Sequence, residues 1–188
     1  MPINLEIETK ALINEKQYKQ ILSSCNQKSY TQINYYIDNK DFSLSKHYGL
    51  RIRFKYGKYE LTLKINAREG KMEINQDISE DEFINYKNNH IFPHGEVEEK
   101  IKELNIDLGS LFIFGEMTTT RTDISYNDSL ISIDKSSYLN KVDYEVECES
   151  NSLIKATNDL KLFLKEKDVD FKANHLTKLA RLISTIKN

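Results

Sequence analysis

The stretch Leu5-Glu6-Ile7-Glu8-Thr9-Lys10 decides how this chain folds. Its residues alternate between charged and uncharged side chains with a period of two, which is the period of a β-strand. The two glutamates and the lysine then share one face of the strand, and Leu5 and Ile7 share the other. Neighbouring carboxylates repel each other unless a positive group lies between them, and a hard divalent cation often serves. The alternative is a strand whose charged face meets solvent.

The composition limits the class of protein. The chain has 188 residues, of which 39% are hydrophobic and 30% are charged, and its net charge is −2. This length predicts one domain over residues 1–188. The charge does not favour nucleic acid, and no apolar run approaches the about 18 residues of a membrane span. Because the sequence shows no signal peptide, and Cys25 and Cys148 lack the spacing of a disulfide or zinc site, we expect a cytoplasmic protein.

The alternating pattern of the first strand recurs along the chain. Carboxylates gather on the polar faces of the first and last strands, and Arg and Lys gather on the strands between them. A sheet with one face in water would carry a loose mixture of polar residues instead. The pattern therefore predicts an α+β fold, a closed antiparallel β-barrel of about eight strands with a polar interior and helices outside. The strands expected after the first are Tyr30–Asp38, Tyr48–Phe54, Tyr59–Ile65, Lys71–Asn75, Phe112–Asp123, Leu130–Asp134 and Val142–Glu149.

Capping residues and apolar stripes predict the helices. Asn14 is expected to cap the first helix, and Ser79 with Glu82 forms the capping box of the second. The last helix is expected to follow a cap at Asn174. The apolar stripes of the two helices between these are Val97, Ile101 and Leu104, and then Leu153, Ile154, Leu160 and Leu164.

A series of charged motifs follows in order along nearly the whole chain. It runs Glu6-Ile7-Glu8-Thr9-Lys10, Tyr35-Tyr36-Ile37-Asp38, Leu50-Arg51-Ile52-Arg53, Leu61-Thr62-Leu63-Lys64, Glu73, Thr120-Arg121, Asp134, Tyr144-Glu145-Val146-Glu147 and Lys178-Leu179-Ala180-Arg181. The series resembles the CYTH superfamily, the triphosphate tunnel metalloenzymes, whose signature is Glu-x-Glu-x-Lys. That superfamily includes class IV adenylyl cyclases, thiamine triphosphatases, inorganic triphosphatases and fungal RNA triphosphatases. The resemblance implies a tunnel that holds a triphosphate on basic residues and Mg²⁺ or Mn²⁺ on glutamates.

The residue types agree with that chemistry. A triphosphate spreads several charges over hard oxygens, so its binding needs several Arg and Lys donors. The expected substrate-binding residues are Lys10, Arg51, Arg53, Lys64, Arg121, Lys178 and Arg181. Arg181 has an alternative role as an ion pair with a barrel strand. Lys71 belongs to no motif of the series.

Carboxylate oxygens are the ligands that Mg²⁺ and Mn²⁺ prefer. Without a metal, crowded carboxylates are expected to raise one another's pKa. A charged edge strand that resists aggregation is the alternative for the last pair of glutamates. The expected metal ligands are Glu6, Glu8, Glu145 and Glu147, with Glu73 and Asp134 as second candidates, and the expected catalytic residues are Glu6, Glu8, Lys10 and Glu147.

Other polar residues are given structural interpretations. Asp143 and Glu149 are expected to be solvated strand ends, and Cys148 is expected in the core. Tyr36 either orients a phosphate or a purine, or fills the barrel beside Asp38. The histidines belong to no motif and are expected at the surface, at His47, His90, His94 and His175.

The reaction is less constrained than the site. Metal-activated water attacking a terminal phosphoryl group needs no covalent nucleophile. A cyclase needs a further pocket for adenine and ribose, for which the sequence pattern identifies no residues. We therefore expect a metal-dependent triphosphatase acting on tripolyphosphate or a small organic triphosphate. The alternatives are a class IV adenylyl cyclase and a triphosphate- or polyphosphate-binding module without turnover, and the resemblance leaves a homodimer open.

Overall fold

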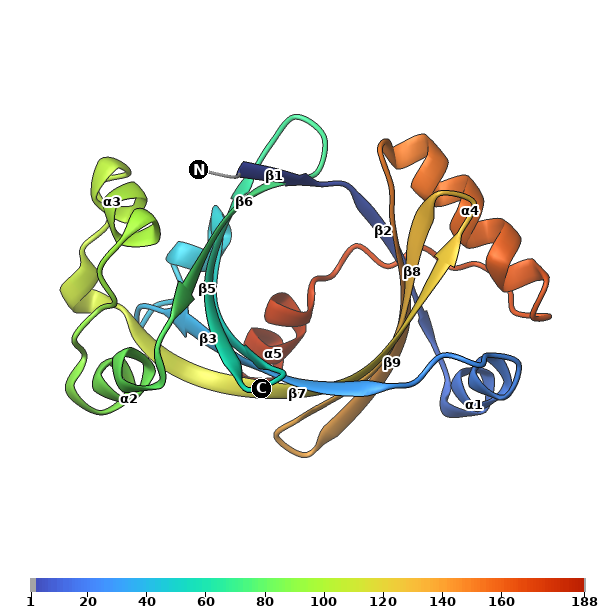
Figure 1. Ribbon diagram of the computed structural model, residues 1–188, viewed down its shortest axis with the longest axis horizontal. Coiled ribbons are helices and arrows are strands. Elements are labelled where there is room, and N and C mark those ends of the chain that lie inside the picture. Colours follow the sequence, from blue (N-terminus) through green and yellow to red (C-terminus); the bar gives the residue numbers. More distant parts are fainter. Residues whose placement is uncertain (1–2, 188) are drawn as a thin grey trace.

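A single antiparallel sheet dominates the computed structural model, which describes residues 3–187. In these residues it contains nine strands, in the order β1-β6-β5-β4-β3-β7-β8-β9-β2. Figure 1 looks down the resulting barrel, with the strands as its wall. The strands are β1 (Ile3–Glu6), β2 (Glu8–Ile13), β3 (Tyr30–Asp38), β4 (Tyr48–Lys55), β5 (Lys58–Asn66), β6 (Lys71–Ile78), β7 (Phe112–Tyr126), β8 (Ser129–Tyr138) and β9 (Lys141–Glu149).

The N-terminal segment closes the barrel because it supplies both edges of the sheet. β1 pairs with β6 and β2 pairs with β9, with Ile7 between them. The segment expected to be one strand is therefore two, and the expected number of strands is one too low. Closing a twisted sheet requires its strands to be staggered. Because the segment is interrupted at Ile7, its first part can pair with β6 and its second part with β9. The charge alternation continues across Ile7, so the pattern gives no sign of the break.

Helices cover the barrel on two sides. Their bounds are α1 (Glu15–Ser23), α2 (Glu80–Asn89), α3 (Glu96–Glu103), α4 (Leu153–Lys165) and α5 (Lys178–Lys187). Asn14 and Ser79 form the capping boxes of α1 and α2, as predicted. The expected cap of α5 is wrong, because Asn174 forms a local turn with Leu176 and the helix begins only at Lys178. None of the helices in the described residues is long and apolar enough to cross a membrane.

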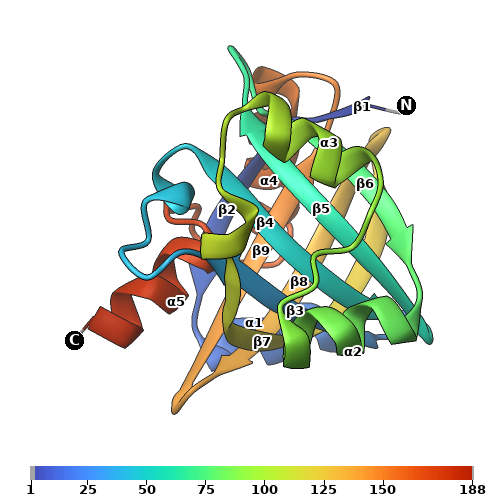
Figure 2. The same cartoon turned by 90° about the vertical axis from the view of Figure 1, so that its left-hand side faces the viewer.

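The outward faces of the strands form two hydrophobic cores. α2 and α3 pack over β4, β5 and β6, where Ile52, Leu61 and Phe83 are buried (Figure 2). α1 and α4 pack over β2, β8 and β9, where Val146 and Cys148 are buried, which confirms the core position of Cys148. Because the apolar faces point outward under helices, the polar faces point into the barrel.

α5 lies at one end of the barrel rather than on its side (Figures 1 and 2). Leu182 of this helix packs against Tyr36 and Met117 of the wall. The helix therefore brings its first turn, which begins with Lys178, to the barrel interior.

Candidate active site in the barrel interior

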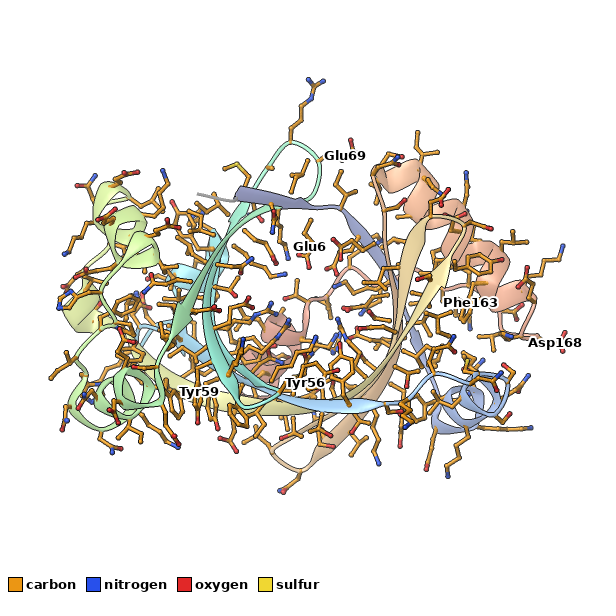
Figure 3. All side chains as sticks on the ribbon, viewed as in Figure 1. Glu6, Tyr56, Tyr59, Glu69, Phe163 and Asp168 are labelled. Carbon is orange, nitrogen blue, oxygen red and sulfur yellow. The ribbon has the colours of Figure 1, made fainter. Side chains whose placement is uncertain are left out.

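The inward faces of the strands line a cavity of about 390 Å³. Figure 3 shows side chains from the whole wall converging on it, with Glu6 at the upper rim. Asp134 and Glu145 do not line the cavity but contact Lys178, which does, and Arg181 in turn contacts Glu145. The predicted site residues that line the cavity are Glu6, Glu8, Lys10, Arg51, Arg53, Lys64, Glu73, Arg121, Glu147 and Lys178.

Three buried carboxylates form the first cluster. One oxygen each of Asp134, Glu145 and Glu147 lies within 4.8 Å of the others. The register of β8 and β9 places Asp134 opposite Glu145. The Nζ atom of Lys178 enters this cluster, 2.8 Å from Asp134 Oδ2 and 2.9 Å from Glu147 Oε1, and it also contacts Glu145. An ammonium group thus stands among three carboxylates.

Arg121 binds two of the same carboxylates. Its Nε and Nη2 atoms donate to the two oxygens of Asp134 at 2.7 and 2.6 Å, and Nη2 also donates to Glu147 Oε2 at 2.6 Å. Burial alone would raise the pKa of Glu147, but Lys178, Lys10 and Arg121 hold that pKa well below its ordinary value. The carboxylate of Glu147 is therefore charged over the whole physiological range.

Glu6 and Glu73 share a second ammonium group. Lys64 Nζ lies 2.5 Å from Glu6 Oε2 and also contacts Glu73, its register partner on β6. Burial works to raise both pKa values, but Lys64 and Arg51 lower the pKa of Glu73 to about 2, whereas the pKa of Glu6 stays raised. The expected mutual rise in pKa is thus confirmed at Glu6, where the charges of Glu8 and Glu73 add to the effect of burial, whereas Glu73, for which no rise was expected, is held low by Lys64 and Arg51.

Glu8 belongs to a third ion pair. Lys10 Nζ lies 2.5 Å from Glu8 Oε1 and 3.3 Å from Glu147 Oε1. The break at Ile7 places Glu6 and Glu8 on strands that pair with opposite edges of the sheet. Each therefore has its own lysine partner.

The opposite part of the wall is positive, and its cations form no ion pair within the described residues. Arg51, Arg53 and Lys55 alternate along the inward face of β4, and within residues 3–187 none of them forms an ion pair. The Nε atom of Arg51 is buried without a hydrogen-bond partner, and that of Arg53 donates to Asn34 Oδ1 at 2.9 Å. Burial, together with the charges of Arg51 and Arg121, lowers the pKa of Arg53 to about 10. Such a row favours a bound anion.

Lys71 is a cavity residue that the motif series missed. It lies on β6 opposite Glu6, and burial and Lys64 lower its pKa. The sequence did contain a sign of this position, because Lys71 shares one strand face with Glu73 and Asn75. The exposed side chains of His47 and Glu149 also reach the cavity mouth.

The interpretation of Asp143 as a solvated strand end is wrong. Its Oδ2 atom accepts from the hydroxyl group of Tyr138 at 2.5 Å and from Arg181 Nε at 2.9 Å. The other guanidinium nitrogens of Arg181 donate to Glu145 at 3.0 and 3.1 Å, so this arginine ties α5 to β9. That geometry fits the structural alternative considered for Arg181.

Tyr36 and Asp38 have separate places at the end of β3. Tyr36 lines the cavity and packs against Leu182 of α5. Asp38 is fully buried, and its carboxylate accepts from the backbone N–H groups of Leu44 and Ser45 at 3.0 and 3.1 Å. Asp38 thus holds the loop that precedes β4.

The clustered donors fit a hard divalent cation. Carboxylate oxygens converge from β8 and β9, and the ammonium group of Lys178 already occupies the place between them where positive charge is favoured. The same ammonium group is also a donor for an anion. The cavity can therefore accommodate a polyanion and a cation together.

Comparison with known proteins identifies relatives of the whole barrel. The family model of the CYTH domain matches residues 4–171. The protein named "Putative triphosphatase YjbK" of Bacillus subtilis (strain 168) is 38% identical over 154 residues, which cover 80% of each chain.

Solved structures have the same fold. A crystal structure described as "a putative adenylate cyclase" from Bacillus halodurans is 32% identical, covers 96% of this chain and 98% of its own, and superimposes with a TM-score of 0.88. A Hippeastrum protein, described as a "Putative adenylyl cyclase" that "reveals a dominant triphophatase activity", is 23% identical, covers 96% of each chain, and superimposes with a TM-score of 0.80. The second likeness shows the fold alone.

Proposed function

The chain belongs to the CYTH domain family, and from this membership and the barrel interior we propose that it is a metal-dependent triphosphatase. The proposed substrate is tripolyphosphate or a small organic triphosphate. The observation that carries the proposal is the division of one cavity into two parts. Cations without counter-ions line β4, and carboxylates already bridged by ammonium groups line the wall around β2, β8 and β9.

Arg51 and Arg53 are proposed as the first ligands of the triphosphate. Neither has a carboxylate partner within the described residues, so phosphate oxygens would supply the missing negative charge. The planar guanidinium groups can each bind two oxygens. Of the other predicted ligands, Arg181 is proposed to act only through α5, because its donors are already bound to Asp143 and Glu145.

The lysines are proposed to exchange partners when the substrate enters. Lys10, Lys64 and Lys178 bridge carboxylates, and phosphate oxygens would give these ammonium groups other anionic partners. Arg121 would keep Asp134 and Glu147 in position through its charged hydrogen bonds. The exchange leaves carboxylate oxygens free at the centre of the cavity.

Mg²⁺ or Mn²⁺ is proposed as the cofactor. A divalent cation in such a site supplies charge neutralisation and makes water a better nucleophile at neutral pH. The chain's own part is to hold the terminal phosphoryl group on the cations of β4 and to exclude bulk water at the end that α5 covers. The proposed ligands are Glu6, Glu8, Glu145 and Glu147, with Glu73 and Asp134 next to them.

One series of incubations tests the function. The protein is mixed with tripolyphosphate, ATP or thiamine triphosphate, each with Mg²⁺ or Mn²⁺, while phosphate, pyrophosphate and cyclic AMP are followed. We expect phosphate release that excess EDTA abolishes and added metal restores. Glu147→Gln is expected to lower turnover at least about a hundredfold, because it removes the negative charge that Lys10, Arg121 and Lys178 share.

Glu103→Gln is the matched control, because Glu103 lies on the outer helix α3 and, within residues 3–187, pairs only with Lys100. Cyclic AMP and pyrophosphate from ATP would replace the triphosphatase proposal with cyclase activity. Binding without any product would indicate a triphosphate-binding module. That residues 1–188 act as one domain, in the cytoplasm or as a homodimer, stays a prediction.

A further inference from the structure

The hairpin between β4 and β5 carries an aromatic side chain where a small residue would fit better. Its two turn residues, Tyr56 and Gly57, have φ values of 51° and 76°, and Lys55 pairs with Lys58 across the turn. Two-residue turns of this kind favour Asn-Gly, and a positive φ is unfavourable for a bulky side chain. Tyr56 is nevertheless 70% exposed, so burial does not explain the ring.

The ring of Tyr56 lies beside two residues that line the cavity. Its centroid is 5.2 Å from that of Tyr30. The Nζ atom of Lys55 lies 4.3 Å from the Tyr30 ring centroid and 5.2 Å from the Tyr56 ring centroid. Asp123 holds Tyr30 in place by accepting from its hydroxyl group at 2.7 Å. In the end-on view of Figure 3, Tyr56 lies on the opposite side of the barrel opening from Glu6.

The row of cations on β4 leads from the cavity to this aromatic pair. At a rise of about 3.4 Å per residue, the row from Arg51 to Lys55 extends about 14 Å along the strand. Arg51 and Arg53 lie deeper, and Lys55 lies next to the hairpin. A triphosphate bound to the two arginines would therefore direct whatever it carries towards Lys55 and the two tyrosines.

We propose that Tyr30, Lys55 and Tyr56 form a mouth subsite for the planar heterocyclic group of an organic triphosphate. The exposed ring of Tyr56 stacks on that group, and Lys55 binds the phosphate nearest to it. The inference rests on the proposed function and sharpens it, because it selects a base-bearing triphosphate over tripolyphosphate. It also supplies the base-binding residues that the sequence pattern did not identify.

Tyr56→Asn tests the subsite without disturbing the fold. Asparagine removes the ring and suits the turn, so the melting temperature should not fall. Binding of tripolyphosphate and of the β,γ-imido analogue of ATP is measured by calorimetry with and without Mg²⁺, and KM is measured for tripolyphosphate and ATP. We expect the variant to weaken analogue binding and to raise KM for ATP about tenfold, with tripolyphosphate changed less than about twofold. Tyr56→Phe should behave as wild type.

Leu139→Asn is the matched control. Leu139 begins another hairpin turn, has a φ of 47° and is 63% exposed, but it does not line the cavity. Equal losses for both ligands, no loss for either, or loss only for tripolyphosphate would overturn the subsite. If no triphosphate is hydrolysed but Tyr56→Asn still weakens analogue binding selectively, the proposed function fails and the subsite stands.

Discussion

Arg51 and Arg121 bring the same charge into one cavity but differ in what surrounds them. Arg121 holds Asp134 and Glu147 through three hydrogen bonds. Arg51 has an unpartnered Nε and stands beside another arginine on the same strand face. Arg121 thus stabilises the wall before any ligand arrives, whereas Arg51 is available for a ligand.

Replacing each arginine by methionine should separate these roles. Without metal or phosphate, Arg121→Met is expected to lower the free energy of unfolding by about 3–5 kcal/mol, because Asp134 and Glu147 lose one of their buried cationic partners and keep only lysines. Arg51→Met should change it by less than about 1 kcal/mol or raise it, because a buried repulsion is removed. Urea denaturation measures both values. Equal losses of the free energy of unfolding would mean that Arg51 is stabilised by a partner as strongly as Arg121 is.

The residue types were readable from sequence, but their partners were not. Alternation correctly turned Glu6, Glu8 and Lys10 inward. It could not show that Lys64 and Lys178 insert between carboxylates, since these contacts join residues far apart in the chain. This is why the expected mutual rise in pKa failed at Glu147, although it holds at Glu6.

Among the elements, the β5–β6 hairpin holds the position of Glu6. Gly70 has a φ of 78°, and a Cβ atom there would collide with the backbone carbonyl of Glu6 and meet Ile7. Gly57 has a similar φ of 76° in the β4–β5 hairpin, but a Cβ atom there would meet nothing within 4 Å. The two glycines therefore share one backbone requirement and differ in one contact.

Substituting alanine at each glycine should isolate that contact. Gly57→Ala is expected to cost about 1–2 kcal/mol from its backbone conformation alone. Gly70→Ala should cost more and should also lower triphosphatase turnover, because it pushes β1 and Glu6 away from Lys64. Denaturation and steady-state kinetics on both variants measure the difference. Identical behaviour would show that the hairpin does not position Glu6.

Elements with a strict period were predicted closely, and those fixed by packing were not. β3 has the predicted bounds, Tyr30–Asp38, because polar residues alternate with Ile33, Tyr35 and Ile37 along most of it, although its pairing with β7 shifts register after Tyr36. β7 extends past its predicted end at Asp123 to Tyr126. α5 begins at Lys178, and Arg181 ties it to β9. This contact joins distant parts of the chain, so a capping pattern at Asn174 could not indicate where the helix begins.

For the whole molecule, the cavity links ligand binding to stability. A ligand that binds only the closed barrel stabilises it by about 2.7 kcal/mol at a hundredfold excess over Kd. Tripolyphosphate with Mg²⁺ is therefore expected to raise the melting temperature by about 5–10 °C. Arg53→Ala should reduce this shift, and Glu103→Gln should not. Thermal unfolding at several ligand concentrations measures it, and an unchanged shift in Arg53→Ala would remove this arginine from the site.

The break at Ile7 has a consequence for the order in which a nascent chain can assemble. β1 finds its partner once β6 has been made, but β2 must wait for β9, the last strand of the sheet. During synthesis β2 is then an unpaired edge beside a half-built sheet, open to pairing with other chains. Closure depends on contacts between β2 and β9, which are more than a hundred residues apart in the chain, so we expect it to be the slow step of folding. Chaperone demand and aggregation on the ribosome should therefore be greatest just before residues 141–149 emerge.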